Sequence, residues 1–162
     1  MYAIVFELHR IAPNVLTTVV GNVTALLSIS DPERRHAVVK LLGRLFYSPS
    51  SDIGSKFGSC YCKWTERVND VDANVRKTVG RCLVKILENK GSGANGELSR
   101  LATAGLTQLL NDTSAEIRIE VVHNICDLAS ESPSKVSERS ERALRRLECE
   151  ECEMATDGYI HY

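Results

Sequence analysis

The strongest constraint on the fold of this chain is a repeat of about 42 residues that runs through its first 130 positions. Three arginines mark the register, because Arg34, Arg76 and Arg118 follow one another at intervals of 42 residues. Four apolar columns keep the same interval: Leu26, Val68 and Leu110; Ala37, Val79 and Val121; Leu41, Leu83 and Ile125; Leu45, Leu87 and Ala129. Such a period predicts stacked supersecondary units, each of which covers the core of the next.

Within each unit the apolar residues recur at helical spacing, as at Val75 and Val79, which predicts a well-defined second helix. Ser30 and Glu33 have the spacing of a capping box, and Asp72 is expected to cap the second helix of the middle unit. Weaker patterns predict the first helices over residues 15–28, 57–69 and 98–111. Segments rich in Ser, Pro and Gly predict the connecting loops at 48–55 and 91–96.

These patterns predict an all-α protein, a solenoid of about three helical hairpins over residues 1–130. Residues 131–162 are expected to form a divergent charged tail, with one helix and then a disordered end. The segment 11–30 carries no charge, but Pro13, Asn14 and Asn22 interrupt it, which disfavours a membrane span. A content of 43% hydrophobic and 25% charged residues is typical of a globular chain.

The turn between the two helices of a unit resembles that of HEAT repeats. The HEAT pattern has an Asp, four residues, then Val or Ile and an Arg, which fits Asp70 with Arg76 and Asp112 with Arg118. The first unit departs from it, with Ser28 in place of the Asp. The resemblance implies that these Asp and Arg side chains form a structural ladder between stacked repeats.

A closer resemblance is to the "precocious dissociation of sisters" proteins, which are large HEAT-repeat regulators of sister-chromatid cohesion. The similar segments are residues 6–16, 33–46 and 67–76, together with Trp64. The likeness covers roughly residues 3 to 129 and fades after Ala129. Chains of that family are several times longer, so this one resembles a fragment, an abbreviated paralogue or an incomplete gene model.

The family resemblance implies a non-catalytic, nuclear, chromatin-associated scaffold. Its expected partners are the kleisin subunit of cohesin and the cohesin-releasing factor, and no cofactor or membrane is expected. Two alternatives stay open. One is an unrelated HEAT adaptor of the transport-receptor or phosphatase-scaffold type, and the other, less favoured, is a solenoid that binds nucleic acid through its basic half.

Motifs for other chemistry are weak. Cys60 with Cys62 and Cys149 with Cys152 could supply four thiolates to zinc, but the first pair lacks the usual spacing. Free thiols are therefore preferred, and no metal site is expected. The glycine-rich loop at 91–96 lacks the Lys and the Ser or Thr of a phosphate-binding loop. No nucleophile-elbow pattern is present.

Charge is distributed unevenly along the chain and marks one candidate binding surface. Residues 1–90 contain 13 basic and 8 acidic side chains, whereas residues 91–162 contain 7 and 13. Lys77, Arg81 and Lys85 recur every four residues on the predicted second helix of the middle unit, which places like charges along one face. The stripe has no acid beside it on this helix at Asn74, Thr78 or Val84. We therefore expect it to be solvated and available, and to bind an acidic partner.

Overall fold

The computed structural model describes residues 13–48, 53–90 and 96–131, and within them all regular structure is helical. The first repeat contains α2 (Pro13–Ala25), the 3₁₀ turn η1 (Leu26–Ser28) and α3 (Pro32–Tyr47). The second contains α4 (Ile53–Lys56), α5 (Gly58–Thr65), the 3₁₀ turn η2 (Glu66–Asn69) and α6 (Ala73–Lys90). The third contains α7 (Gly96–Leu109) and α8 (Ala115–Glu131).

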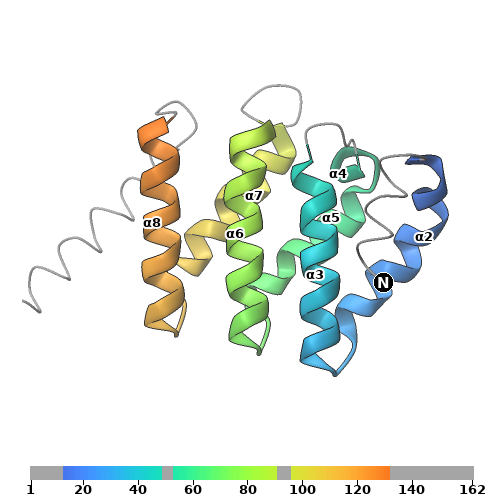
Figure 1. The fold of residues 1–162 in the computed structure, drawn as a ribbon, viewed down its shortest axis with the longest axis horizontal. Helices are drawn as coiled ribbons and strands as arrows, with labels where there is room; N and C mark the ends of the chain where they lie inside the picture. The colour runs from blue at the N-terminus through green and yellow to red at the C-terminus, as the bar shows by residue number, and fades with distance from the viewer. Residues whose placement is uncertain (1–12, 49–52, 91–95, 132–162) are drawn as a thin grey trace, which may run out of the picture.

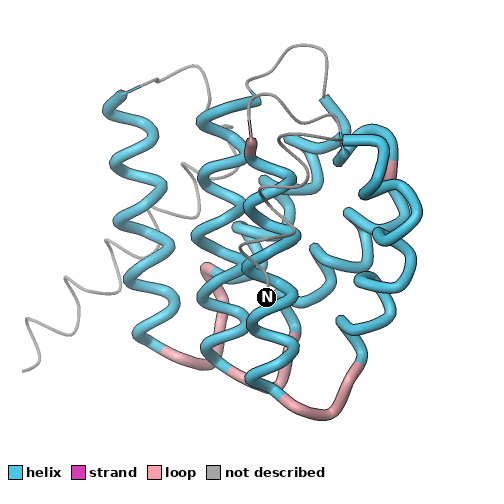
Figure 2. The backbone as a smooth tube through the Cα atoms, turned by 45° about the vertical axis from the view of Figure 1, so that its right-hand side comes forward, coloured by secondary structure: helices cyan, strands magenta, loops and turns pink. Residues whose placement is uncertain are grey.

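The helices form two layers. Figure 1 shows the second helices α3, α6 and α8 standing side by side in front, with α5 and α7 behind them and α2 at the right-hand edge. The turned view in Figure 2 shows the same order. The middle helix, α6, packs against α3 on one side and α8 on the other, and against α7 behind. This is the predicted all-α solenoid of helical hairpins.

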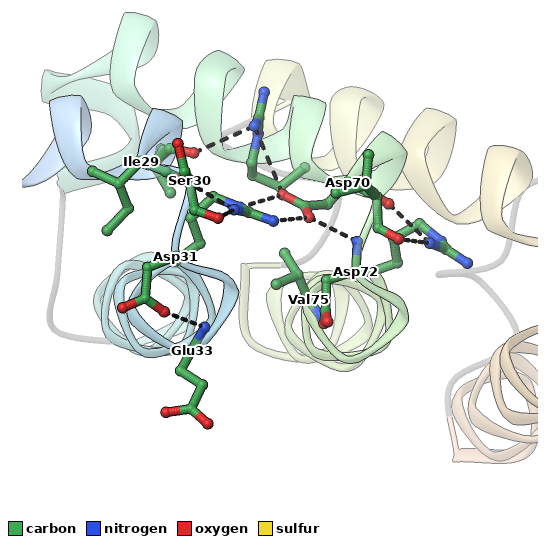
Figure 3. A network of polar contacts seen from close by, with 12 residues as sticks. Ile29, Ser30, Asp31, Glu33, Asp70, Asp72 and Val75 are labelled. Carbon is green, nitrogen blue, oxygen red and sulfur yellow. Dashed lines mark hydrogen bonds and ion pairs between the residues drawn. The ribbon is translucent and has the colours of Figure 1, made fainter.

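Local side chains define where the second helices begin. The Asp31 carboxylate accepts hydrogen bonds from the backbone N–H groups of Glu33 and Arg34 at 3.0 and 3.2 Å, with Pro32 in the first helical turn. Asp31 is therefore the cap of α3, and the prediction of Ser30 was wrong by one position. Asp72 caps α6 as predicted, accepting from Val75 N at 3.1 Å (Figure 3).

An aromatic cluster fills the core between the first and second repeats. The ring of Phe46 meets those of Tyr61 and Trp64 edge to face, with centroids 5.0 and 5.3 Å apart. The two polar groups of the cluster are both hydrogen-bonded, since Trp64 Nε1 donates to Val39 O at 2.9 Å and the Tyr61 hydroxyl donates to Leu98 O at 3.0 Å. These two bonds join neighbouring helices and satisfy both buried side-chain donors of the aromatic cluster.

Gly43 lets α3 approach this cluster and α6. A Cβ atom at position 43 would lie 2.5 Å from Cys82 Sγ and 3.2 Å from the Trp64 ring. A larger side chain at this position would require the Cys82 side chain and the Trp64 ring to shift. The close contact brings the facing surfaces of α3 and α6 together, which matters for the groove described below.

The structure corrects the register of the first repeat by one residue. Leu27 is 2% exposed and belongs to the core, whereas Leu26, from the 42-residue column, is 40% exposed. An offset of 41 residues between the first and second repeats aligns buried positions throughout: Leu27, Val68 and Leu110; Val38, Val79 and Val121; Leu42, Leu83 and Ile125. The interval between the second and third repeats stays at 42 residues.

Two predictions fall on residues that the structure does not describe. The charged tail lies outside them from residue 132 onward, and most of the glycine-rich loop lies outside them as well. Among the helices of the described ranges, none is both long and apolar enough to cross a membrane.

Candidate functional site

A buried ion pair joins the first repeat to the second. Arg35 donates through Nε and Nη2 to the two oxygens of the Asp70 carboxylate, at 3.0 and 2.7 Å. Its Nη1 donates to the carbonyl oxygens of Ile29 and Ser30 at 2.8 and 2.9 Å. Both side chains are nearly inaccessible, at 7% and 2% exposure. Figure 3 shows Asp70 facing the turn formed by Ile29, Ser30 and Asp31.

The same arrangement recurs one repeat later. Arg76 donates through Nε and Nη2 to Asp112 at 2.7 and 2.9 Å, and through Nη1 to the carbonyl oxygen of Asp70 at 2.8 Å. Arg118 makes the corresponding backbone contact, with Nη1 2.8 Å from Asp112 O. Arg76, Asp70 and Asp112 of the predicted ladder therefore lie together, but the guanidinium of Arg76 pairs with the carboxylate of the following repeat rather than with that of its own turn.

The ladder residue of the first repeat is Arg35, which the sequence pattern missed. The 42-residue column contained Arg34, whose side chain is 76% exposed and pairs with Asp31 at 3.2 Å. Arg35 occupies the position of Arg76 because each donates to the carbonyl oxygen six residues before it. The doubled arginine at 34 and 35 concealed the one-residue offset.

Both carboxylates of the ladder are held in their charged form. Burial opposes ionisation of Asp70, but hydrogen bonds from Arg35 and from the Asp72 backbone, with the charges of Arg35 and Arg67, lower its pKa below the usual range. For Asp112 the hydrogen bond from Arg76 is the largest influence, and it lowers the pKa against the cost of burial.

The predicted basic stripe on α6 is not the free surface we expected. Lys77 pairs with Glu116 and lies 3.2 Å from Glu120, and Arg81 also pairs with Glu120. Both acids come from α8, the neighbouring second helix. The stripe has no acid beside it at positions 74, 78 or 84 of α6, as expected. The next repeat nevertheless contributes two acids that pair with Lys77 and Arg81, so these two side chains are not available as expected.

Lys85 has a different environment at the other end of the stripe. Its Nζ lies 5.3 Å from the centre of the Tyr47 ring of α3, a cation–π contact that leaves the ammonium exposed. Lys85 thus faces α3, whereas Lys77 faces α8.

A basic groove lies instead between α3 and α6. The hollow has a volume of about 390 Å³ and is lined by His36, Lys40, Arg44, Tyr47, Thr78, Arg81, Cys82 and Lys85. Four of these eight residues carry a permanent positive charge, and none carries a carboxylate. Sequence reasoning had found Arg81 and Lys85 but missed Lys40 and Arg44. Their four-residue spacing on the adjacent second helix was a signal that could have found them.

The cysteines and histidines of the described ranges do not form a metal-binding cluster. No group of three or more His, Cys, Asp or Glu side chains within them could hold an ion. Cys60 is buried, with Sγ 2.9 Å from the Thr24 hydroxyl, whereas Cys62 is exposed. Cys149 and Cys152 lie outside the described residues.

Together, the stacked hairpins, the inter-repeat Arg–Asp pairs and the basic groove define a HEAT-type α-solenoid. Comparison with known proteins then specifies the family. A family profile described as sister chromatid cohesion protein PDS5 matches residues 1–149, so the chain belongs to the PDS5 family. The match extends 20 residues beyond Ala129, where we had expected the resemblance to fade.

Individual relatives give the same result. The chain is 30% identical over 128 residues to sister chromatid cohesion protein PDS5 homolog A of Arabidopsis thaliana, which covers 79% of this chain and 8% of that protein. It is 27% identical over 143 residues to PDS5 homolog A of Gallus gallus and of Homo sapiens, covering 86% of this chain and 10% of each relative. The chain thus spans a tenth or less of the length of these relatives.

Proposed function

We propose that this chain is a non-catalytic, protein-binding segment of a cohesin regulator, acting in the nucleus on chromatin. Its partners are the kleisin subunit of cohesin and the releasing factor that acts with it, and the binding tunes how long cohesin stays on chromatin. Membership of the PDS5 family supports a role in sister-chromatid cohesion. The kleisin subunit and the releasing factor are proposed as the partners through which the chain performs this role.

One observation supports partner binding most directly, namely the concentration of basic side chains on the second-helix layer. Lys40 and Arg44 on α3 and Arg81 and Lys85 on α6 line one hollow without a carboxylate among its lining residues. Charge of one sign on a solenoid face attracts a partner of the opposite sign and raises the rate of association. An acidic stretch of a cohesin subunit is the partner that fits this surface.

The experiment that tests the proposal is a calorimetric titration of the full chain, residues 1–162, with kleisin fragments and with the releasing factor. We expect saturable binding that weakens as salt is raised, because the complementary charges are screened. The fold of the chain is checked beforehand by far-ultraviolet circular dichroism.

Two outcomes would contradict the proposal. If the folded chain binds neither cohesin component, the proposed partners are wrong, and a HEAT adaptor of another pathway is favoured. Binding to duplex DNA alone, with affinity that falls steeply and linearly on a logarithmic salt scale, would favour the nucleic-acid alternative.

A further inference from the structure

We infer that the groove between α3 and α6 binds a linear acidic peptide of about five extended residues. The inference rests on the proposed function only for the identity of the protein that carries the peptide. It replaces the sequence-derived stripe of Lys77, Arg81 and Lys85 with a surface formed by two helices.

The charge of the groove comes from two matched pairs. Lys40 and Arg44 stand one turn apart on α3, and Arg81 and Lys85 stand one turn apart on α6. Like charges at that spacing each destabilise an isolated helix by a few tenths of a kcal/mol. An anionic ligand between the two helices would lie close to all four of these positive side chains.

Both ends of the groove are defined by polar contacts. At one end, His36 Nε2 lies 2.7 Å from Thr78 Oγ1, and at the other the Lys85 ammonium lies over the Tyr47 ring. Cys82 is buried, at 6% exposure, between the two walls. From His36 to Tyr47 the helix rises roughly 16 Å, and an extended peptide covers that length with about five residues.

The neighbouring helix favours a short peptide over a nucleic acid. Glu116 and Glu120 of α8 flank the α6 side of the groove, where they pair with Lys77 and Arg81. A duplex spanning the second-helix layer would bring its phosphates against these two carboxylates. A peptide confined between α3 and α6 avoids them.

Glu120 also provides an internal competitor for the ligand. Arg81 lines the groove while its Nε pairs with Glu120, whose side chain is 22% exposed. A carboxylate of the peptide must share Arg81 with Glu120. Removing the charge of Glu120 should therefore strengthen binding. Removing that of Glu116 should have less effect, because within the described residues Glu116 pairs with Lys77, which lies outside the groove lining.

The test uses the full chain and a fluorescent ten-residue peptide rich in Glu, with a Gln-rich peptide of equal length as the uncharged probe. Lys40→Gln combined with Lys85→Gln removes two charges from the groove. The matched control, Lys56→Gln combined with Lys63→Gln, removes two charges elsewhere, since neither residue lines the groove. Fluorescence anisotropy gives the affinities, and circular dichroism confirms that each variant is folded.

We expect the groove variant to lose about tenfold in affinity for the Glu-rich peptide and the control to change less than about twofold, because screening limits distant charges at physiological salt. Glu120→Gln should raise affinity by about threefold, and by more than Glu116→Gln does. Equal losses for the groove variant and its control would overturn the inference. So would binding of the Gln-rich peptide as tight as that of the Glu-rich one, or no binding of either.

The outcomes also separate this inference from the proposed function. If the chain binds a kleisin fragment and the groove variant binds it equally well, the groove assignment fails and the proposed function stands. If the groove binds the Glu-rich peptide as expected but the chain binds no cohesin component, the groove assignment stands and the proposed partners are wrong.

Discussion

Replacing Arg35 with alanine should destabilise the chain far more than the same change at Arg34. Alanine at 35 removes both hydrogen bonds to Asp70 and leaves a carboxylate that is 2% exposed without its main partner. Removing one partner of a buried ion pair costs about 3 to 5 kcal/mol. We expect the lower end, about 3 kcal/mol, because Asp70 still accepts from Asp72 N at 3.0 Å and lies near Arg67. The melting temperature should fall by roughly 10 °C for a chain of this size.

The assay is thermal and urea unfolding of the full chain followed by circular dichroism, with Arg34→Ala as the matched control. Arg34 is a neighbouring arginine on the same helix, but its pair with Asp31 is exposed and should contribute little. A third variant, Arg35→Met with Asp70→Leu, removes both charges and should recover much of the lost stability. Equal midpoint shifts for Arg35→Ala and Arg34→Ala would refute the assignment of Arg35 to the ladder.

Three further predictions follow from packing and titration. Gly43→Ala should cost about 1 to 3 kcal/mol through overpacking, whereas Gly21→Ala, with no atom within 4 Å of the added Cβ, should stabilise α2; urea midpoints compare the two. Because folding lowers the pKa values of Asp70 and Asp112, their ionised forms stabilise the folded chain. This stabilisation is complete above the unfolded Asp pKa of about 3.9 and is lost as the pH falls through the folded pKa values. Urea midpoints should therefore drop steeply in acid. Burial raises the pKa of Cys82 to about 11, so iodoacetamide should leave this thiol unmodified at pH values near 8 until the chain unfolds, as peptide mass spectrometry would show.

The repeat architecture was predictable from sequence, but its register in the first repeat was not. Each of the misassigned columns has a second suitable residue beside it, as at Leu26 and Leu27, and at Arg34 and Arg35. A shift of one residue therefore leaves the sequence pattern intact. Only burial and hydrogen bonding distinguish the two registers, because they depend on which member of each doublet faces the next repeat.

Sequence patterns located only the α6 side of the basic groove. Periodicity along α6 located Arg81 and Lys85, but the residues that complete or neutralise this surface lie on other second helices. Lys40 belongs to α3 and Glu120 to α8, 41 and 39 residues from Arg81. Contacts over such separations depend on how neighbouring repeats stack, which periodicity along a single helix does not show.

Asp70 has a consequence for how the stack comes apart. Its carboxylate binds the arginine of the preceding repeat, and its carbonyl oxygen binds Arg76, which in turn binds Asp112 of the following repeat. Loosening this single turn therefore weakens two interfaces at once. In arrays whose stability is a sum of unit and nearest-neighbour contributions, such shared residues make adjacent units unfold together. The three repeats should consequently melt as one cooperative block, with the middle turn as the position where a local disturbance spreads in both directions along the chain.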